Sequence, residues 1–331
     1  MRGIGKRTIA KSVFDKISNQ FEGSYFVRNI REESTGPYGL TRMQQELLSS
    51  ILKHPIGFTK GRLGRKQVLI ILDDVTTLEQ PIFLLKYLVA LDMPHSNIEQ
   101  LWSSTQLQNL KHIDLSFSKH LKIQDLSLAS NLENLILEGC TSLCEIASSI
   151  YGLNYKLLIL NLTQCKSLGS LPTGIRLESP KKVIFSGCSN LKLFSQISWN
   201  MKELYLDQTA IKELPSSIEK LSRLVILNLK DWFMLERLPS NISVLKSLEY
   251  LNLSGCSILH GLPDNLGNLE ALRVLKAEGV PMREVPTSIL NLRCLEELDL
   301  TSCGIEELPN NLGQLSSLKS LLLGRNSLRA F

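Results

Sequence analysis

The sequence predicts an α/β protein in which a curved solenoid of short parallel strands follows an incomplete α/β fragment of the P-loop nucleotide-binding type. Three observations predict this fold class. A leucine pattern returns at nearly constant spacing along most of the chain. A Leu-Pro pair returns between its copies. Near the start, a glycine-rich segment precedes a helical pattern and then an apolar run that ends at two aspartates.

The leucine pattern is clearest between residues 224 and 323. One copy runs from Leu248 to Cys256 and fits L-x-x-L-x-L-x-x-C, and the intervals between successive copies here are 24, 24, 23 and 23 residues. This spelling and this period are typical of leucine-rich repeats. About eleven copies can be traced along the chain, and the last of them is cut short.

The spelling of each copy predicts a short strand. In L-x-L both leucines point to one side of a strand and the residue between them points to the other side. A single repeat cannot bury its leucines alone, so neighbouring repeats must stack. The stacked strands are expected to form a parallel sheet along the concave side of an arc, with the leucines inside.

The cysteine count is odd, with seven residues and no C-x-x-C pair. Five cysteines occupy the last position of the repeat pattern, where the chain turns away from the strand. A shared position of this kind predicts single buried thiols rather than disulfides or metal ligands. It also favours a reducing, intracellular compartment. The five residues are Cys140, Cys165, Cys188, Cys256 and Cys303.

The Leu-Pro pairs belong to the return half of each repeat. Proline lacks an N–H and has a fixed φ, so it suits an irregular convex side better than a hydrogen-bonded strand. An apolar residue follows three positions after each proline, which predicts a second row of buried side chains. The prolines of the regular copies are Pro215, Pro239, Pro263, Pro286 and Pro309.

The outward residues of the strands are the candidate functional residues. Their chemistry is mixed and contains neither a metal-binding cluster nor a catalytic constellation, and the five histidines are scattered. We therefore expect a surface that recognises a protein ligand, not an enzyme; a solvated face without a partner is the alternative. The candidate ligand-binding residues are Tyr205, Asp207, Asn228, Lys230, Tyr250, Asn252, Lys276, Glu278, Glu297 and Asp299.

The first ninety residues predict a different structure. Helical patterns cover residues 6–18 and 41–53, and strand patterns cover residues 24–29 and 68–72. The order of glycine-rich loop, helix and buried strand ending in aspartate is that of a P-loop nucleotide site, in which backbone N–H groups and a lysine hold phosphates and a hydroxyl holds Mg²⁺. The candidate residues are Gly3, Gly5, Lys6, Thr8 and Asp73.

Three segments also resemble a known family. MRGIGKRTIAKSVFDKI, FEGSYFVRNIREES and KQVLIILDDV are similar to successive blocks of the NB-ARC nucleotide-binding domain of plant intracellular disease-resistance receptors, in the subclass with a Toll/interleukin-receptor-like domain. LDMPHSNIEQLW and LKHIDLSFSKHL resemble the first repeats of that subclass. On this resemblance, residues 1–80 are a partial NB-ARC domain, 81–90 a junction and 91–331 the repeats.

The resemblance implies a function. Such receptors use ADP or ATP with Mg²⁺ as a switch, and nucleotide exchange drives receptor self-association and defence signalling. Their repeats sense a pathogen effector or a guarded host protein. The resemblance thus implies a protein ligand on the concave repeat face and a location in the cytoplasm or the nucleus.

Departures from the family pattern concern the nucleotide site. The first glycine of the family loop is missing, Arg2 replaces a second glycine, and Arg7 replaces the hydroxyl residue that would hold Mg²⁺. The feeding strand, the later NB-ARC blocks and the Toll-like domain have no counterpart. We therefore expect a truncated receptor whose nucleotide binding is weak or lost. A working ADP/ATP switch and a non-functional truncated gene product are the alternatives.

Composition and charge exclude other classes of function. Of the net charge of +5, residues 1–90 carry 14 Lys and Arg against 8 Asp and Glu, and the remainder carries 23 against 24. A nucleic-acid-binding protein would show a continuous basic stripe. No apolar run approaches the about 20 residues of a membrane span. Three glycosylation sequons, at Asn161, Asn241 and Asn252, would matter only in a secreted receptor, and no secretory signal is recognisable.

Overall fold

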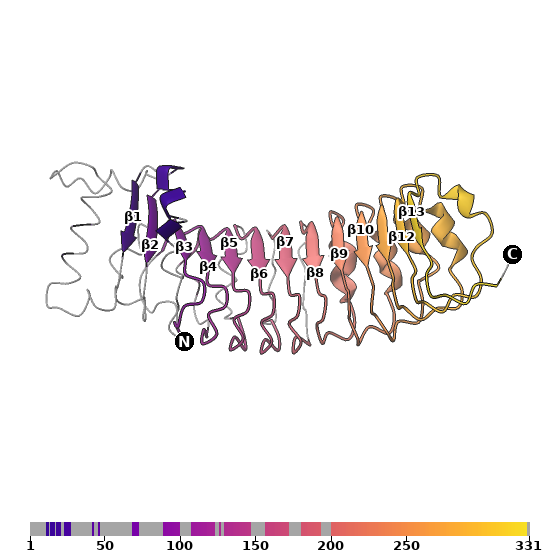
Figure 1. Cartoon of the computed structure of the whole chain (residues 1–331), viewed down its shortest axis with the longest axis horizontal. Helices are drawn as coiled ribbons and strands as arrows, with labels where there is room; N and C mark the ends of the chain where they lie inside the picture. The colour runs from indigo at the N-terminus through magenta and orange to yellow at the C-terminus, as the bar shows by residue number, and fades with distance from the viewer. Residues whose placement is uncertain are drawn as a thin grey trace.

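A computed structural model of the chain describes part of its residues. These are 11–12, 14–16, 18–20, 23–27, 42, 46, 68–72, 89–99, 107–122, 126, 129–146, 156–171, 180–192 and 200–329. Figure 1 shows their arrangement along one long axis. The predicted phosphate-loop residues Gly3, Gly5, Lys6 and Thr8, and the predicted metal-holding Asp73, lie outside the described residues.

Eleven short parallel strands form one sheet within the described part of the chain, in the same order as in the sequence. Neighbouring strands pair with their central residues opposite each other, as in Leu251 with Leu227 and Leu275. This sheet of stacked strands confirms the predicted repeat solenoid (Figure 1). The strands are β3 Ala90–Asp92, β4 His112–Asp114, β5 Asn134–Ile136, β6 Ile159–Asn161, β7 Lys182–Ile184, β8 Glu203–Tyr205, β9 Ile226–Asn228, β10 Tyr250–Asn252, β11 Val274–Lys276, β12 Glu297–Asp299 and β13 Ser320–Leu322.

The core is the continuous column of side chains behind these strands. The central residue of each strand from β3 to β12 is buried, whereas Leu321 of β13 is exposed. Full burial of one such leucine contributes roughly 1.5–3 kcal/mol. Because each leucine packs against the same position of the repeats on either side, stability arises between repeats and not within one.

A tight turn follows every strand of this sheet. The third residue after each strand has a left-handed backbone, with φ between +53° at Asp231 and +75° at Gly255. Only four of these eleven positions are glycine, and for that reason the sequence pattern did not reveal the turn. The positions are His95, Phe117, Gly139, Gln164, Gly187, Gln208, Asp231, Gly255, Gly279, Ser302 and Arg325.

Three of these glycines, Gly139, Gly187 and Gly255, face a side chain of the preceding repeat in addition to having a positive φ. A Cβ at Gly139 would lie 2.5 Å from the Phe117 ring, and one at Gly255 would lie 2.1 Å from Asp231 Oδ1. In all three cases the side chain at the left-handed position of one repeat lies over the glycine of the next. A substituent therefore has no room there without movement of the earlier side chain.

The return half of the repeats differs from the expected irregular backbone. Five short 3₁₀ helices occupy it between residues 216 and 314. Pro215 precedes the first of them with φ −63°, and its carbonyl accepts the N–H of Ile218 at 2.9 Å. Proline thus begins a helical turn here, because its φ suits a helix start and the missing N–H is not needed there. The helices are η4 Ser216–Lys220, η5 Ser240–Val244, η6 Leu266–Asn268, η7 Thr287–Asn291 and η8 Leu312–Gln314.

The N-terminal segment contains a second, two-stranded parallel sheet. β1 Gly23–Val27 pairs with β2 Val68–Leu72, and the short 3₁₀ helix η1 Ser18–Gln20 precedes β1. The strand expected at 24–29 is therefore shifted, while the one at 68–72 has the predicted bounds. Residues 11–12, 14–16, 42 and 46 are helical, within the two predicted helices. Val27 is buried in the same hydrophobic cluster as Leu91 of the first repeat.

Candidate functional site

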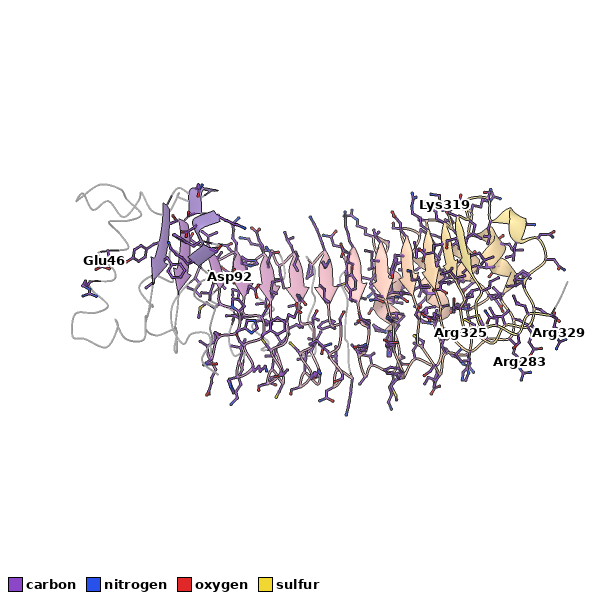
Figure 2. All side chains as sticks on the ribbon, viewed as in Figure 1. Glu46, Asp92, Arg283, Lys319, Arg325 and Arg329 are labelled. Carbon is purple, nitrogen blue, oxygen red and sulfur yellow. The ribbon has the colours of Figure 1, made fainter. Side chains whose placement is uncertain are left out.

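The candidate site is the outward face of the eleven-stranded sheet, which we call the sheet face. It consists of the first and third residue of each strand and the second residue after the strand. All ten predicted ligand-binding residues lie at these positions, within β8 to β12 or two residues after them. Figure 2 shows side chains along the whole sheet, from Asp92 near β3 to Lys319 near β13.

Three of the predicted residues also stabilise the scaffold. Side-chain oxygens of Asn228, Asn252 and Asp299 accept the backbone N–H two residues later, at 3.2, 3.0 and 3.0 Å. Asp114 and Asn161 make the same bond in earlier repeats. This contact secures the chain as it leaves the strand. Asn252 is only 6% exposed, so its contribution to a binding surface, or as a glycosylation acceptor, is small.

A charged cluster lies in the middle of the sheet face. Lys182 Nζ lies 2.7 Å from Glu203 Oε2, which also accepts the Tyr205 hydroxyl at 3.1 Å. The ammonium group lies 5.3 Å from the Tyr205 ring centroid. Burial, followed by the charge and hydrogen bond of Glu203, raises the pKa of Tyr205 to about 12. The Tyr205 hydroxyl is therefore a fixed donor. Lys182 was missing from the predicted site.

Hydrogen bonds link further predicted residues to their neighbours. Asp207 Oδ1 accepts the Ser186 hydroxyl at 2.6 Å and Asn228 Nδ2 at 3.1 Å. Asn252 Nδ2 donates to the Tyr250 hydroxyl at 3.3 Å. These contacts hold polar groups of the sheet face in one orientation, which reduces the entropy lost when a ligand binds.

A second ion pair lies toward the C-terminal repeats. Lys276 Nζ lies 3.0 Å from Glu297 Oε1, and this hydrogen bond raises the pKa of Lys276. Lys230, after β9, and Glu278, after β11, are exposed. The sheet face between β7 and β12 thus combines two ion pairs with the half-buried rings of Tyr205 and Tyr250.

The first repeats carry two facing carboxylates that the sequence analysis did not select. Asp92 and Asp114 are register partners on β3 and β4. Asp92 is exposed, and partial desolvation by its surroundings, followed by the charge of Asp114, raises its pKa, while His112 opposes this shift. No group of three His, Cys, Asp or Glu side chains among the described residues could hold a metal ion.

The five thiols at the end of the repeat pattern have a structural role, as predicted. Each is buried and unbridged, and its Sγ donates to the carbonyl of the residue that follows the strand of the preceding repeat, at 3.0–3.2 Å. Asn326 uses its amide for the same bond at 2.8 Å. Burial raises the pKa of Cys140, Cys256 and Cys303 to about 11, so these thiols are poor nucleophiles.

A membrane-spanning helix would have to be long and apolar. None of the described helices is both long enough and apolar enough to cross a bilayer.

Comparisons with known proteins agree with this architecture. A family model described as "Leucine-rich repeat region" matches residues 187–280 and 251–329, and one described as "Leucine Rich Repeat" matches residues 87–106. Among solved structures, the leucine-rich repeat domain of the type III effector XopL superimposes with a TM-score of 0.51 at 19% identity, over 97% of this chain and 96% of that domain. At this identity the likeness concerns the fold alone.

Curated relatives come from Arabidopsis thaliana. The chain is 47% identical over 238 residues to the disease resistance protein LAZ5, which covers 71% of this chain and 20% of LAZ5. It is 44% identical over 146 residues to the disease resistance protein RPP2A, which covers 44% of this chain and 11% of RPP2A. The aligned part is thus a tenth to a fifth of these relatives. The chain contains leucine-rich repeats and is homologous to disease resistance proteins of Arabidopsis thaliana.

Proposed function

We propose that this chain acts in plant disease resistance as a receptor or part of one, and that its sheet face recognises a protein ligand, either a pathogen effector or a guarded host protein. The observation that carries the proposal is the surface between β7 and β12. It presents two tyrosines and two ion pairs on strands whose positions are fixed by buried leucines.

The chemistry of this surface suits protein recognition. Tyrosine offers a large contact area at a low cost in conformational entropy and is enriched among residues that dominate binding energy. Tyr205 and Tyr250 are half-buried, and each hydroxyl already has a partner within the sheet face. A partner therefore meets side chains that are already ordered, with charged groups on both sides that favour a complementary surface.

The binding test uses displayed fragments of secreted pathogen proteins and of host proteins, selected on the whole chain. Binders are then measured on two variants. Tyr205→Ala with Tyr250→Ala is expected to weaken binding at least about tenfold, since each tyrosine is an anchor. Lys220→Ala with Val244→Ala, on the return half of the repeats, serves as the control. Binders that lose affinity only for the control variant would place recognition elsewhere and refute the proposal.

The proposal also covers the cellular compartment of the chain and its binding of ADP or ATP. Five buried, unbridged thiols support a reducing compartment, such as the cytoplasm or nucleus, which fractionation of a fluorescent fusion would test. The family resemblance implies ADP or ATP with Mg²⁺ and receptor self-association. We propose that Gly3, Gly5, Lys6, Thr8 and Asp73 form at most a weak phosphate site, because Arg7 stands where a Mg²⁺-binding hydroxyl is needed.

A further inference from the structure

A row of side chains runs along one edge of the sheet face, at the residue immediately before each strand. We call it the edge row. Its members are stacked by backbone hydrogen bonds between successive repeats. The N–H of Lys181 donates to the carbonyl of Leu158, that of Lys202 to Lys181, and that of Val225 to Lys202, each at 2.8 Å. Side chains at this position are therefore nearest neighbours from one repeat to the next.

Charges in the edge row are paired with opposite charges in most repeats. Lys111 lies 2.8 Å from Glu133. Arg273 lies 3.6 Å from Glu249 and 2.8 Å from Glu296. Glu296 also accepts Lys319 at 2.6 Å, and hydrogen bonds from Lys319 and Arg273 lower the pKa of Glu296. Opposite charges on adjacent repeats are thus the rule in this row.

Lys181 and Lys202 are the exception to this charge pairing in the edge row. They are exposed neighbours of the same charge, and neither forms an ion pair with a described residue. Glu203, which follows Lys202 directly in the sequence, is engaged by Lys182 and Tyr205. Like charges directly opposite each other destabilise a sheet. The arrangement is unfavourable for the isolated chain and is relieved when an anionic group binds between the two ammonium groups.

Aliphatic side chains flank the two lysines. Leu158 precedes Lys181 in the row and Val225 follows Lys202, and both are partly exposed. Strands of a sheet lie about 4.8 Å apart, so three intervals separate Leu158 from Val225 by roughly 14 Å. An extended chain covers that distance in about four to five residues at about 3.3 Å per residue.

We propose that Leu158, Lys181, Lys202 and Val225 form a docking row for an acidic segment of a partner protein. Two carboxylates of this segment pair with the lysines, and an aliphatic side chain on each side contacts Leu158 and Val225. The inference rests on the proposed protein recognition and adds the chemistry of the ligand. A nucleic acid fits less well, because it needs a longer run of unpaired cations, and the row on both sides of this site is apolar or already neutralised.

The first test is a selection of random twelve-residue peptides, displayed on phage, against the whole chain. Enriched peptides are expected to carry two Asp or Glu residues between aliphatic residues four or five positions apart. Their affinity is expected to fall about thirtyfold for Lys181→Glu with Lys202→Glu, which is roughly five- to sixfold for each of the two charge pairs. The affinity for the unchanged chain is expected to fall as salt is added. The control Lys212→Glu with Lys220→Glu makes the same charge change on other exposed sites and should alter affinity less than about twofold.

The outcomes of this selection distinguish the docking row from the proposed protein recognition by the sheet face. Enriched peptides without acidic pairs, or with equal affinity for both variants, would overturn the docking row but leave protein recognition standing. A selection that enriches no peptide would overturn the docking row, whereas a failure of the displayed protein fragments to yield binders would overturn the proposed recognition. A single-stranded oligonucleotide that binds in a Lys181- and Lys202-dependent manner, where no peptide does, would assign the site to another ligand.

The second test measures stability. Lys202→Glu places a carboxylate beside Lys181 and restores the opposite-charge pattern of Lys111 and Glu133. The thermal midpoint is therefore expected to stay constant or rise by about 1 °C while affinity for the selected peptides falls. A drop in the midpoint together with retained peptide binding would show that the lysines serve the scaffold and would contradict the inference.

Discussion

Substitution of Gly255 by alanine tests the stacked left-handed turns most directly. Two costs are expected. The backbone at φ +75° disfavours any residue with a Cβ, by about 1–2 kcal/mol. The new Cβ would also lie 2.1 Å from Asp231 Oδ1 and 3.3 Å from Asp231 Cα. Displacement of the aspartate side chain adds about 1–3 kcal/mol, the usual cost of overpacking. The sum is about 2–5 kcal/mol.

Gly279 is the matched control. Its φ is +73°, yet a Cβ there would meet nothing within 4 Å. Gly279→Ala therefore carries the backbone cost alone, about 1–2 kcal/mol. The double variant Asp231→Gly with Gly255→Ala moves the glycine from position 255 to position 231 of the preceding repeat. It should recover the steric part of the loss, since glycine at position 231 removes the side chain that the new Cβ meets.

The assay is equilibrium unfolding in urea, followed by far-ultraviolet circular dichroism, combined with amide hydrogen exchange of β9 to β11. Exchange is needed because unfolding of a repeat array need not be two-state. Equal losses for Gly255→Ala and Gly279→Ala would refute the steric argument. A double variant Asp231→Gly with Gly255→Ala that is no more stable than Gly255→Ala alone would refute the role of Asp231.

Three further predictions concern other parts of the molecule. Burial raises the pKa of the Cys256 thiol to about 11 from a usual value of 9.0, so the unfolded chain loses this proton at a lower pH than the folded chain. The free energy of unfolding should therefore fall between about pH 9 and 11, and Cys256→Ala should make its dependence on pH less steep. An unchanged pH dependence in Cys256→Ala would be contrary evidence. Iodoacetamide at pH 8 should modify the exposed Cys144 and Cys294 of the native chain and spare the five buried thiols, as read by mass spectrometry; rapid modification of Cys165 would be inconsistent with its burial. Titration calorimetry with ADP and Mg²⁺ should show negligible binding, and micromolar binding that Lys6→Ala abolishes would show that the loop still works.

The sequence pattern predicted the repeats because the same residue pattern recurs many times, and each copy predicts the same local structure. Each L-x-L predicted a strand, and the shared cysteine position predicted a buried thiol. The left-handed turn escaped the pattern since residues as different as Phe117, Asp231 and Arg325 occupy it. Its geometry is imposed by the stacking of repeats, which overrides the local preference for glycine.

The candidate site was predicted in outline only. Outward positions followed from strand periodicity, but their partners depend on register between repeats. Lys182 and Glu203 are both the first residue of a strand, and only the pairing of β7 with β8 makes them neighbours. Asn228 and Asp299 accept the backbone N–H two residues later, and a list of outward residues does not separate this scaffold role from a role in binding.

The stacked turns have a consequence for how such an array changes length. Phe117 lies over Gly139, Gln164 would meet any Cβ at Gly187, and Asp231 lies over Gly255. In these three places two successive repeats form a pair, in which the turn of the first repeat carries a large side chain and the turn of the second carries glycine. Deletion of the repeat that contains Gly139 would bring Phe117 opposite Gln164, with a side chain on each. Adjacent turns that both carry side chains occur elsewhere in the described chain, where the His95 and Phe117 rings stack at 4.9 Å and Gln208 donates to Asp231 at 3.2 Å. Loss of a single repeat therefore requires two turn side chains that fit each other, whereas loss of a whole pair leaves the existing contacts in place.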